Sequence, residues 1–105
     1  MEIEQEYKKE DQILILKIDG EIDVSNIAVF KETLLKGIEQ KTPNILLDCE
    51  QLKYIDSTGL GVLVSLYKKA KEMGGSIQII HLKPYLQKIF LITDLDKIFN
   101  IGVGA

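Results

Sequence analysis

Short apolar runs that alternate with helix-like segments constrain the fold of this chain more than any other feature. Residues 13–18, 45–49 and 76–80 have the length and the branched apolar content of strands. The first run is nearly continuous, which is typical of a strand covered on both faces. Between the first two runs, apolar residues recur at helical spacing, at Ile27, Phe30, Leu34 and Ile38. This alternation predicts an α/β domain with a mixed sheet and helices packed against it.

The N-terminal segment predicts a further strand. Ile3, Gln5 and Tyr7 alternate with glutamates, a pattern typical of a strand with one solvated face. A short turn at residues 8–11 separates this strand from residues 13–18, so we expect the two to pair antiparallel. Residues 20–26 are expected to form the loop that leads into the first helix, with Ser25 or Asn26 as its N-cap.

A second long helix is expected to begin near residue 57. Its polar face repeats at Gly61, Ser65, Lys68 and Glu72, and its buried face at Leu60, Leu63, Val64 and Tyr67. Gly74 and Gly75 suit its C-terminal cap. Pro84 suits the first turn of a short helix that runs to Leu91. No repeat or long linker interrupts residues 1–105, which we interpret as a single domain.

Composition excludes several classes of function. The formal net charge is -3, and the thirteen basic residues are scattered lysines, so we expect no contact with nucleic acid or with an anionic membrane. The absence of arginine argues against phosphoryl transfer by the chain itself. The N-terminus lacks the features of a signal peptide, and no apolar run approaches the roughly 20 residues that span a bilayer. We therefore expect a cytoplasmic protein.

Cys49 and His81 are the only cysteine and the only histidine of the chain. Cys49 ends an apolar run, where a small buried thiol is common. His81 follows Ile79 and Ile80 and is interpreted as a residue at a strand end. With one of each, we expect no metal site, no Cys/His nucleophile and no cofactor.

The motif Asp-Ser-Thr-Gly-Leu-Gly at residues 56–61 follows an apolar segment and opens the second long helix. Asp56 suits the N-cap, and the first backbone N–H groups and the helix dipole can accommodate a phosphate on Ser57. Gly59 and Gly61 are expected to keep the outward side of the first turn bare, which leaves the Ser57 hydroxyl accessible. An ordinary helix start uses the same residue types, so this pattern alone does not decide between the two interpretations.

Four segments together carry a resemblance to a known family. The run YIDSTGLGVL at residues 54–63 resembles the signature of STAS domains, and specifically of bacterial anti-sigma factor antagonists. The segments GEID at 20–23, NILLDC at 44–49 and FLITDL at 90–95, with Phe99, resemble other parts of that family in order and spacing. The resemblance covers nearly the whole chain without an insertion.

This resemblance implies a single STAS domain over residues 1–105, with Ser57 as the phosphoacceptor. It implies a mostly parallel mixed sheet with an antiparallel N-terminal strand pair. The unphosphorylated form is expected to bind an anti-sigma factor that is also a serine kinase, which releases the sigma factor. Phosphorylation is expected to end that binding until a serine phosphatase resets Ser57. The expected partner-binding residues are Asp23, Asp56, Thr58, Gly59, Leu60 and Gly61.

Alternatives remain open at this point. The chain can be a STAS interaction module of another system, such as a transporter or a stress complex, without a phosphorylation switch. A small enzyme that uses Asp23, Asp48 and Asp56 is less favoured, because the chain lacks a GxxxxGK[ST] phosphate loop. Thr58 also carries a hydroxyl, so modification can be shared with Ser57. The loop at residues 24–26 leaves the identity of the partner open.

Overall fold

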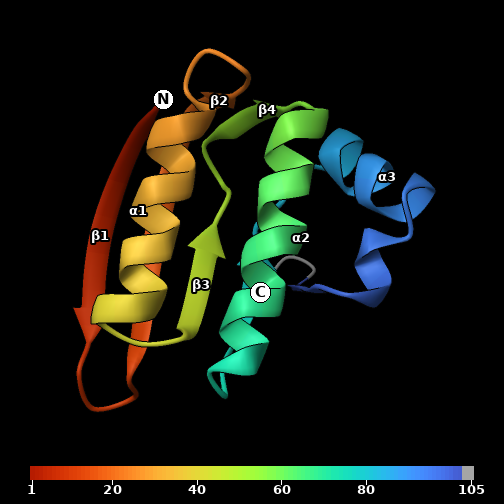
Figure 1. Cartoon of the computed structure of the whole chain (residues 1–105). Coiled ribbons are helices and arrows are strands. Elements are labelled where there is room, and N and C mark those ends of the chain that lie inside the picture. Colours follow the sequence, from red (N-terminus) through yellow and green to blue (C-terminus); the bar gives the residue numbers. More distant parts are fainter. Residues whose placement is uncertain (103–105) are drawn as a thin grey trace.

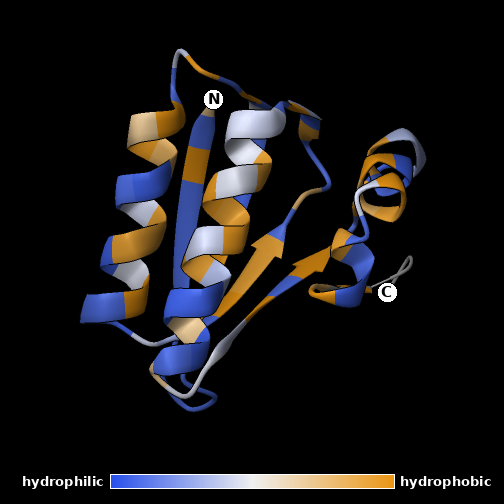
Figure 2. Cartoon of the chain, turned by 45° about the vertical axis from the view of Figure 1, so that its right-hand side comes forward, coloured by the Kyte–Doolittle hydropathy of each residue, from blue (hydrophilic) through white to orange (hydrophobic). Residues whose placement is uncertain are grey.

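A mixed β-sheet forms the centre of the computed structural model, which describes residues 1–102. The strands are β1 (Glu2–Lys8), β2 (Ile13–Ile22), β3 (Asn44–Asp48), β4 (Leu52–Ile55), β5 (Ser76–Ile80) and β6 (Asn100–Gly102). The helices are α1 (Ile27–Gln40), α2 (Ser57–Glu72), α3 (Pro84–Ile92) and the 3-10 turn η1 (Leu95–Lys97). Helices α1 and α2 lie side by side over one face of the sheet, and α3 lies on the far side of α2 from α1 (Figures 1 and 2).

The sheet has the predicted mixture of strand directions. Its main order is β1-β2-β3-β5-β6, and β4 pairs with β2. Among the described strands only the pairing of β1 with β2 is antiparallel, while β2-β3, β3-β5, β5-β6 and β2-β4 are parallel. The predicted α/β class, with an antiparallel N-terminal pair in a mostly parallel sheet, is confirmed.

Strand β2 is longer than predicted. Residues 20–22, expected in a loop, continue the strand and pair with β4 after a register shift between Gly20 and Glu21. Gly20 has a φ of +106°, a conformation that glycine adopts without steric cost. Strand β4 itself was not predicted as a strand, because its four residues place Leu52 and Ile55 inside and the two between them outside, which is no alternating pattern.

The burial of the strands shows that helices cover one face of the sheet. Leu14, Leu16 and Ile18 are buried, whereas Ile13 and Ile15 are half-buried, so the prediction of a strand covered on both faces is wrong for β2. The N-terminal strand is likewise more exposed than predicted: of the side chains expected on its inner face, only Ile3 is half-buried. The reason is its position at the edge of the sheet, beside β2 alone among the described strands.

Helix α1 buries the predicted face, whereas the buried face of α2 is rotated about the helix axis relative to the prediction. Phe30, Leu34 and Ile38 of α1 are buried, as predicted. In α2 the fully buried residues are Gly59, Leu63, Leu66 and Ala70. Of the predicted buried face of α2 only Leu63 is fully buried, because the helix is turned so that Gly59 faces the sheet. Within residues 1–102, no helix combines the length and apolar character needed to cross a bilayer.

The C-terminal part completes the core as the pattern indicated. Helix α2 ends at Glu72, and Gly74, with a φ of +85°, turns the chain into β5. Pro84 stands at the first position of α3. Phe90 and Phe99 are both almost fully buried and meet edge to face with 6.1 Å between their ring centroids. This contact fixes α3 and the last strand against the same core.

Two glycines of α2 have opposite surroundings, which gives a test of the packing. A Cβ at Gly59 comes within 2.5 Å of Ile55 Cγ1 and 2.9 Å of Ile22 Cγ2, whereas a Cβ at Gly61 has no neighbour within 4 Å. We expect Gly59→Ala to lower the free energy of unfolding by about 1–3 kcal/mol through overpacking. Gly61→Ala, the matched control, is expected to raise it by up to about 1 kcal/mol, because alanine favours the helix. Urea denaturation measures both changes, and equal effects would contradict this packing.

Candidate functional site

The strongest candidate site lies where β4 ends and α2 begins. Asp56 is extended, with φ -91° and ψ -178°, and stands at the N-cap of α2. Ser57 follows as the first helical residue and is exposed. The predicted helix start at this motif is confirmed. An exposed hydroxyl therefore stands at the positive end of a sixteen-residue helix.

The Asp56 carboxylate holds the site together through both oxygens. Oδ1 accepts hydrogen bonds from the backbone N–H of Gly59 at 3.0 Å and from the Thr58 hydroxyl at 2.5 Å. Oδ2 accepts from the backbone N–H of Val24 at 3.1 Å. The backbone N–H of Asp56 in turn donates to the carbonyl of Ile22 at 3.1 Å. One carboxylate thus caps α2 and ties the loop after β2 to it.

These hydrogen bonds also set the ionisation of Asp56. The Thr58 hydroxyl makes the largest contribution to lowering the pKa of the carboxyl, followed by the Gly59 N–H, and partial burial opposes them. Hydrogen bonds donated to a carboxylate favour its charged form. Asp56 is therefore an anion throughout the neutral range, directly before the Ser57 hydroxyl.

Asp23 makes its hydrogen bonds within its own loop. Its Oδ1 accepts from the backbone N–H of Ser25 at 2.9 Å and from the Ser25 hydroxyl at 2.5 Å. Its backbone N–H donates to Asn26 Oδ1 at 3.0 Å, so Asn26 stabilises the loop instead of capping α1 with its side chain. The adjacent Val24 bonds Asp56, which brings the Asp23 loop beside the start of α2.

The two neighbouring hydroxyls differ in their hydrogen bonds. The Thr58 hydroxyl is engaged with Asp56, whereas within residues 1–102 the Ser57 hydroxyl makes no side-chain hydrogen bond. Both residues are exposed. The structure thus distinguishes two residues that the sequence alone left as alternatives, and it leaves Ser57 with the more available oxygen.

The glycines and Leu60 of the motif are not equivalent. Gly61 is exposed and has open space around it, as predicted. The prediction that Gly59 faces outward is wrong. Gly59 is buried against Ile55 and Ile22, where any side chain would hold α2 away from the sheet. Leu60 is half-buried and packs against the core. Only some of the expected partner-binding residues are therefore available on the surface.

Two apolar side chains next to the motif were missed by sequence reasoning. Val24, whose backbone bonds Asp56, is 73% exposed, and Tyr54, two residues before Asp56, is 45% exposed. Tyr54 is also the register partner of Glu21 at the end of β2. Their positions in a loop and in an irregular short strand gave no periodic signal. They are exposed apolar residues in the two segments that the Asp56 hydrogen bonds bring together.

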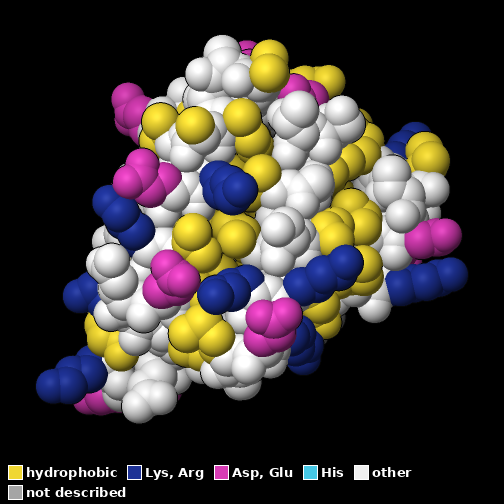
Figure 3. All heavy atoms as spheres, in the orientation of Figure 1, with side chains coloured by type: hydrophobic (Ala, Val, Ile, Leu, Met, Phe, Trp, Pro, Cys, Tyr) yellow, Lys and Arg dark blue, Asp and Glu magenta, His cyan; other side chains and the backbone are white. Residues whose placement is uncertain are grey.

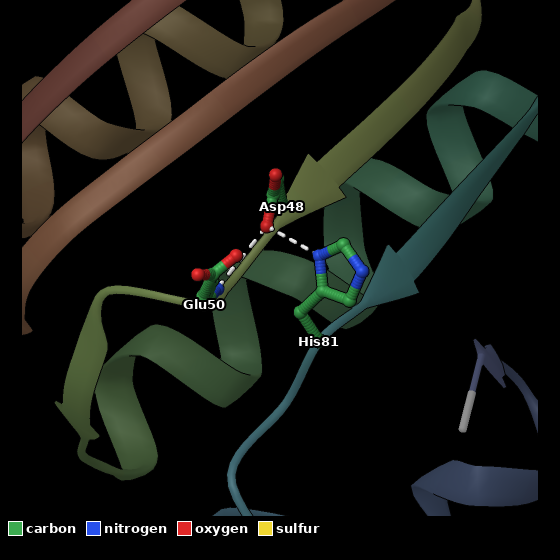
Figure 4. A group of neighbouring side chains, drawn as sticks. All are labelled: Asp48, Glu50 and His81. Atoms are coloured by element: carbon green, nitrogen blue, oxygen red, sulfur yellow. Dashed lines mark hydrogen bonds and ion pairs between the residues drawn. The ribbon is translucent and has the colours of Figure 1, made fainter. Parts of the chain in front are cut away.

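The other polar residues singled out in the sequence lie elsewhere. Cys49 is buried, as predicted, and burial together with the nearby Asp48 carboxylate raises the pKa of its thiol to about 12. His81 does follow a strand, but it lies against Asp48, with Glu50 close by, a cluster that sequence reasoning missed (Figure 4). On the face over α1 and α2, lysines and acidic residues are interspersed and form no basic patch (Figure 3).

Comparisons with known proteins agree on one family. The model of the STAS domain family matches residues 4–103. The chain is 36% identical to an anti-sigma-B factor antagonist of Bacillus subtilis over 105 residues, which is 100% of this chain and 95% of the relative. A crystal structure of a candidate anti-sigma factor antagonist from Thermotoga maritima has a TM-score of 0.83 and 25% identity, covering 98% of this chain and 86% of that one.

A third similar structure is that of the Bacillus cell fate determinant SpoIIAA in its phosphorylated form. Its TM-score is 0.76 over 99% of this chain and 92% of that one, with 17% identity, so it supports the fold. The strand and helix arrangement described above is thus shared with proteins of this class.

The ionisation of Asp56 predicts a pH effect on stability. Because its folded pKa lies below the ordinary value near 4, the carboxylate stabilises the fold above that value. This contribution is lost as the pH falls through the folded pKa. We expect Asp56→Asn, which keeps an N-capping side chain, to show a smaller loss of stability between pH 5 and pH 2 than the wild type. Urea midpoints at both pH values measure this, with Glu10→Gln in an exposed turn as the control; identical losses in wild type and Asp56→Asn would contradict it.

The state of Cys49 predicts its reactivity. A buried thiol with a pKa of about 12 is protonated at pH 8 and is shielded from reagents. We expect a disulfide-exchange reagent to modify native protein only as fast as the protein unfolds, and to modify it immediately in denaturing urea. Rapid modification of the native protein would show that the thiol is accessible.

Proposed function

The chain belongs to the STAS domain family, and we propose that within this family it acts as an anti-sigma factor antagonist. In this proposal the unphosphorylated protein binds an anti-sigma factor and so releases the sigma factor. The 36% identity with an anti-sigma-B factor antagonist supports this role. The observation that carries it is the exposed Ser57 hydroxyl at the first position of α2, next to the anionic Asp56 cap.

Ser57 is the phosphoacceptor of the proposed switch. A phosphate there adds close to two negative charges at a helix N-terminus, where the fold tolerates them. It also adds to the negative charge of Asp56 next to it. An interface fitted to a neutral hydroxyl then has to bury an unpaired anion, and binding is lost. The switch therefore acts on association and leaves the fold intact.

In this proposal the surface that contacts the anti-sigma factor is centred on the loop after β2 and the first turn of α2. Asp23, Asp56, Thr58, Leu60 and Gly61 contribute from these two segments. Gly59, although buried, contributes by letting the turn sit close to the sheet. Val24 and Tyr54 add exposed apolar area beside them. Exposed apolar side chains next to hydrogen-bonding polar groups suit a protein partner, since protein interfaces combine both.

The partner in this proposal is an anti-sigma factor that is also the serine kinase, and a serine phosphatase removes the phosphate. The protein itself has no enzymatic activity and works in the cytoplasm, without direct contact with nucleic acid or membrane. Residues 1–105 act as one domain.

Phosphorylation by candidate anti-sigma kinases from the same genome tests the proposal. We expect incubation with ATP to add one phosphate per chain, detected by intact mass and located by peptide mapping. Ser57→Ala is expected to abolish the modification. Thr58→Val, the matched control, removes the neighbouring hydroxyl and its bond to Asp56 but is expected to keep the phosphate on Ser57.

Binding to the same kinase supplies the second measurement. We expect phosphorylated protein to bind about tenfold or more weakly than the unmodified form. If active kinases leave the folded wild type unmodified, the protein is a STAS module without this switch. If the phosphate persists in Ser57→Ala and disappears in Thr58→Val, the acceptor is Thr58.

A further inference from the structure

We propose that Asp48, Glu50 and His81 bind a divalent transition-metal ion, of which Zn²⁺ is the representative, at the carboxyl ends of β3 and β5 (Figure 4). One donor atom from each residue lies within 4.8 Å of the other two. An imidazole nitrogen with two carboxylate oxygens is a donor set that suits Zn²⁺ and related ions. This site is separate from Ser57 and does not depend on the proposed function.

The topology of the sheet brings the first two residues together. Asp48 is the last residue of β3, and its register partner in the parallel neighbour β5 is Ile80. His81 follows directly and has a φ of +59°, a conformation uncommon outside glycine. Its ring lies against the end of β3, with Nδ1 at 3.0 Å from Asp48 Oδ1. Ligands of α/β proteins commonly bind at this edge, outside the carboxyl ends of parallel strands.

The turn after β3 supplies the third residue. The backbone N–H of Glu50 donates to Asp48 Oδ1 at 3.2 Å, so the turn folds around that carboxylate. The backbone N–H of Cys49 donates to the Ile80 carbonyl at 2.9 Å and holds the two strand ends together. Glu50 is exposed, which leaves its carboxylate room to rotate toward an ion. In Figure 4 it lies just beyond the end of β3, and Asp48 stands between it and the imidazole.

The spacing between the two inner donors fits coordination. Two ligands of a tetrahedral Zn²⁺, each about 2.1 Å from the metal, lie about 3.4 Å apart. Asp48 Oδ1 and His81 Nδ1 are 3.0 Å apart, so they have to separate by only a few tenths of an ångström to bind the ion. Binding therefore exchanges their hydrogen bond for two metal–ligand bonds, and the imidazole turns so that Nδ1 faces the ion instead of the carboxylate oxygen. The exposed Glu50 then closes the site, and water completes the coordination.

The surroundings favour a cation. Asp48 and Glu50 line a surface cleft of about 440 Å³. The cleft's other acidic residues are Glu2, Glu4 and Asp19. Lys17 is its one basic lining residue; it is the register partner of Asp48 but forms no ion pair with it in the described part of the chain. The resulting negative field raises the local concentration of divalent ions.

Zinc titration of the full chain without an affinity tag tests the site. We expect one Zn²⁺ per chain by calorimetry, together with a shift of the imidazole NMR signals, which belong to His81 alone because the chain has one histidine. His81→Asn and Glu50→Gln are each expected to weaken Zn²⁺ binding at least tenfold. Asparagine tolerates a positive φ, so the first variant keeps the local backbone. Mg²⁺, which has little preference for imidazole, is expected to bind more weakly than Zn²⁺.

A matched variant separates coordination from simple charge attraction. Asp19→Asn removes one charge from the same cleft but no proposed ligand, and we expect it to change Zn²⁺ affinity by less than about threefold. The proposal is overturned if His81→Asn binds as the wild type does, if the imidazole signals do not move, or if Asp19→Asn loses as much affinity as Glu50→Gln. Urea midpoints of each variant exclude unfolding as the cause of a loss.

Discussion

The pairing of the strands and the position of the Asp56 cap both depend on the length of β2. Its ten residues allow it to pair with β1 along one side and with β3 and then β4 along the other. The change of partner requires the register shift at Gly20, where the chain has a positive φ. Because β2 runs on to Ile22, the loop that follows reaches the end of β4. The Asp56 cap, with donors from both segments, is possible only there.

The sequence predicted the parts of the fold that rest on local patterns. Residues 45–49 and 76–80 match β3 and β5 within one residue, and residues 13–18 match the start of β2. The caps of α2 and α3 lie where Asp56 and Pro84 indicate. The extension of β2 and the strand β4 were missed because each is stabilised by the other. A four-residue segment carries no periodicity of its own, and its pairing depends on a partner some thirty residues away.

The same limit applies to the sites. The helix start and the exposed Ser57 follow from the motif itself, but the inward position of Gly59 depends on how α2 packs over Ile22 and Ile55. The Asp48–His81 contact joins residues 33 positions apart, and only the parallel register of β3 and β5 brings them together. The expectation of no metal site rested on counting one histidine and one cysteine, and such a count leaves out carboxylates that the sheet brings beside the histidine. Contacts between residues close in sequence can thus be predicted from the sequence alone. Contacts between distant residues depend on how the strands pair in the sheet.

The exposed acidic strand β1 has a consequence for how this protein associates with others. It pairs only with β2 among the described strands, so its outer edge carries unpaired backbone groups, the usual starting point for joining sheets into aggregates. Glu2, Glu4 and Glu6 are exposed along it. A second copy approaching edge to edge meets the same row of negative charges and is repelled. The charge thus disfavours pairing of two sheets along this edge, and the helix and loop surfaces are favoured for contacts with partners.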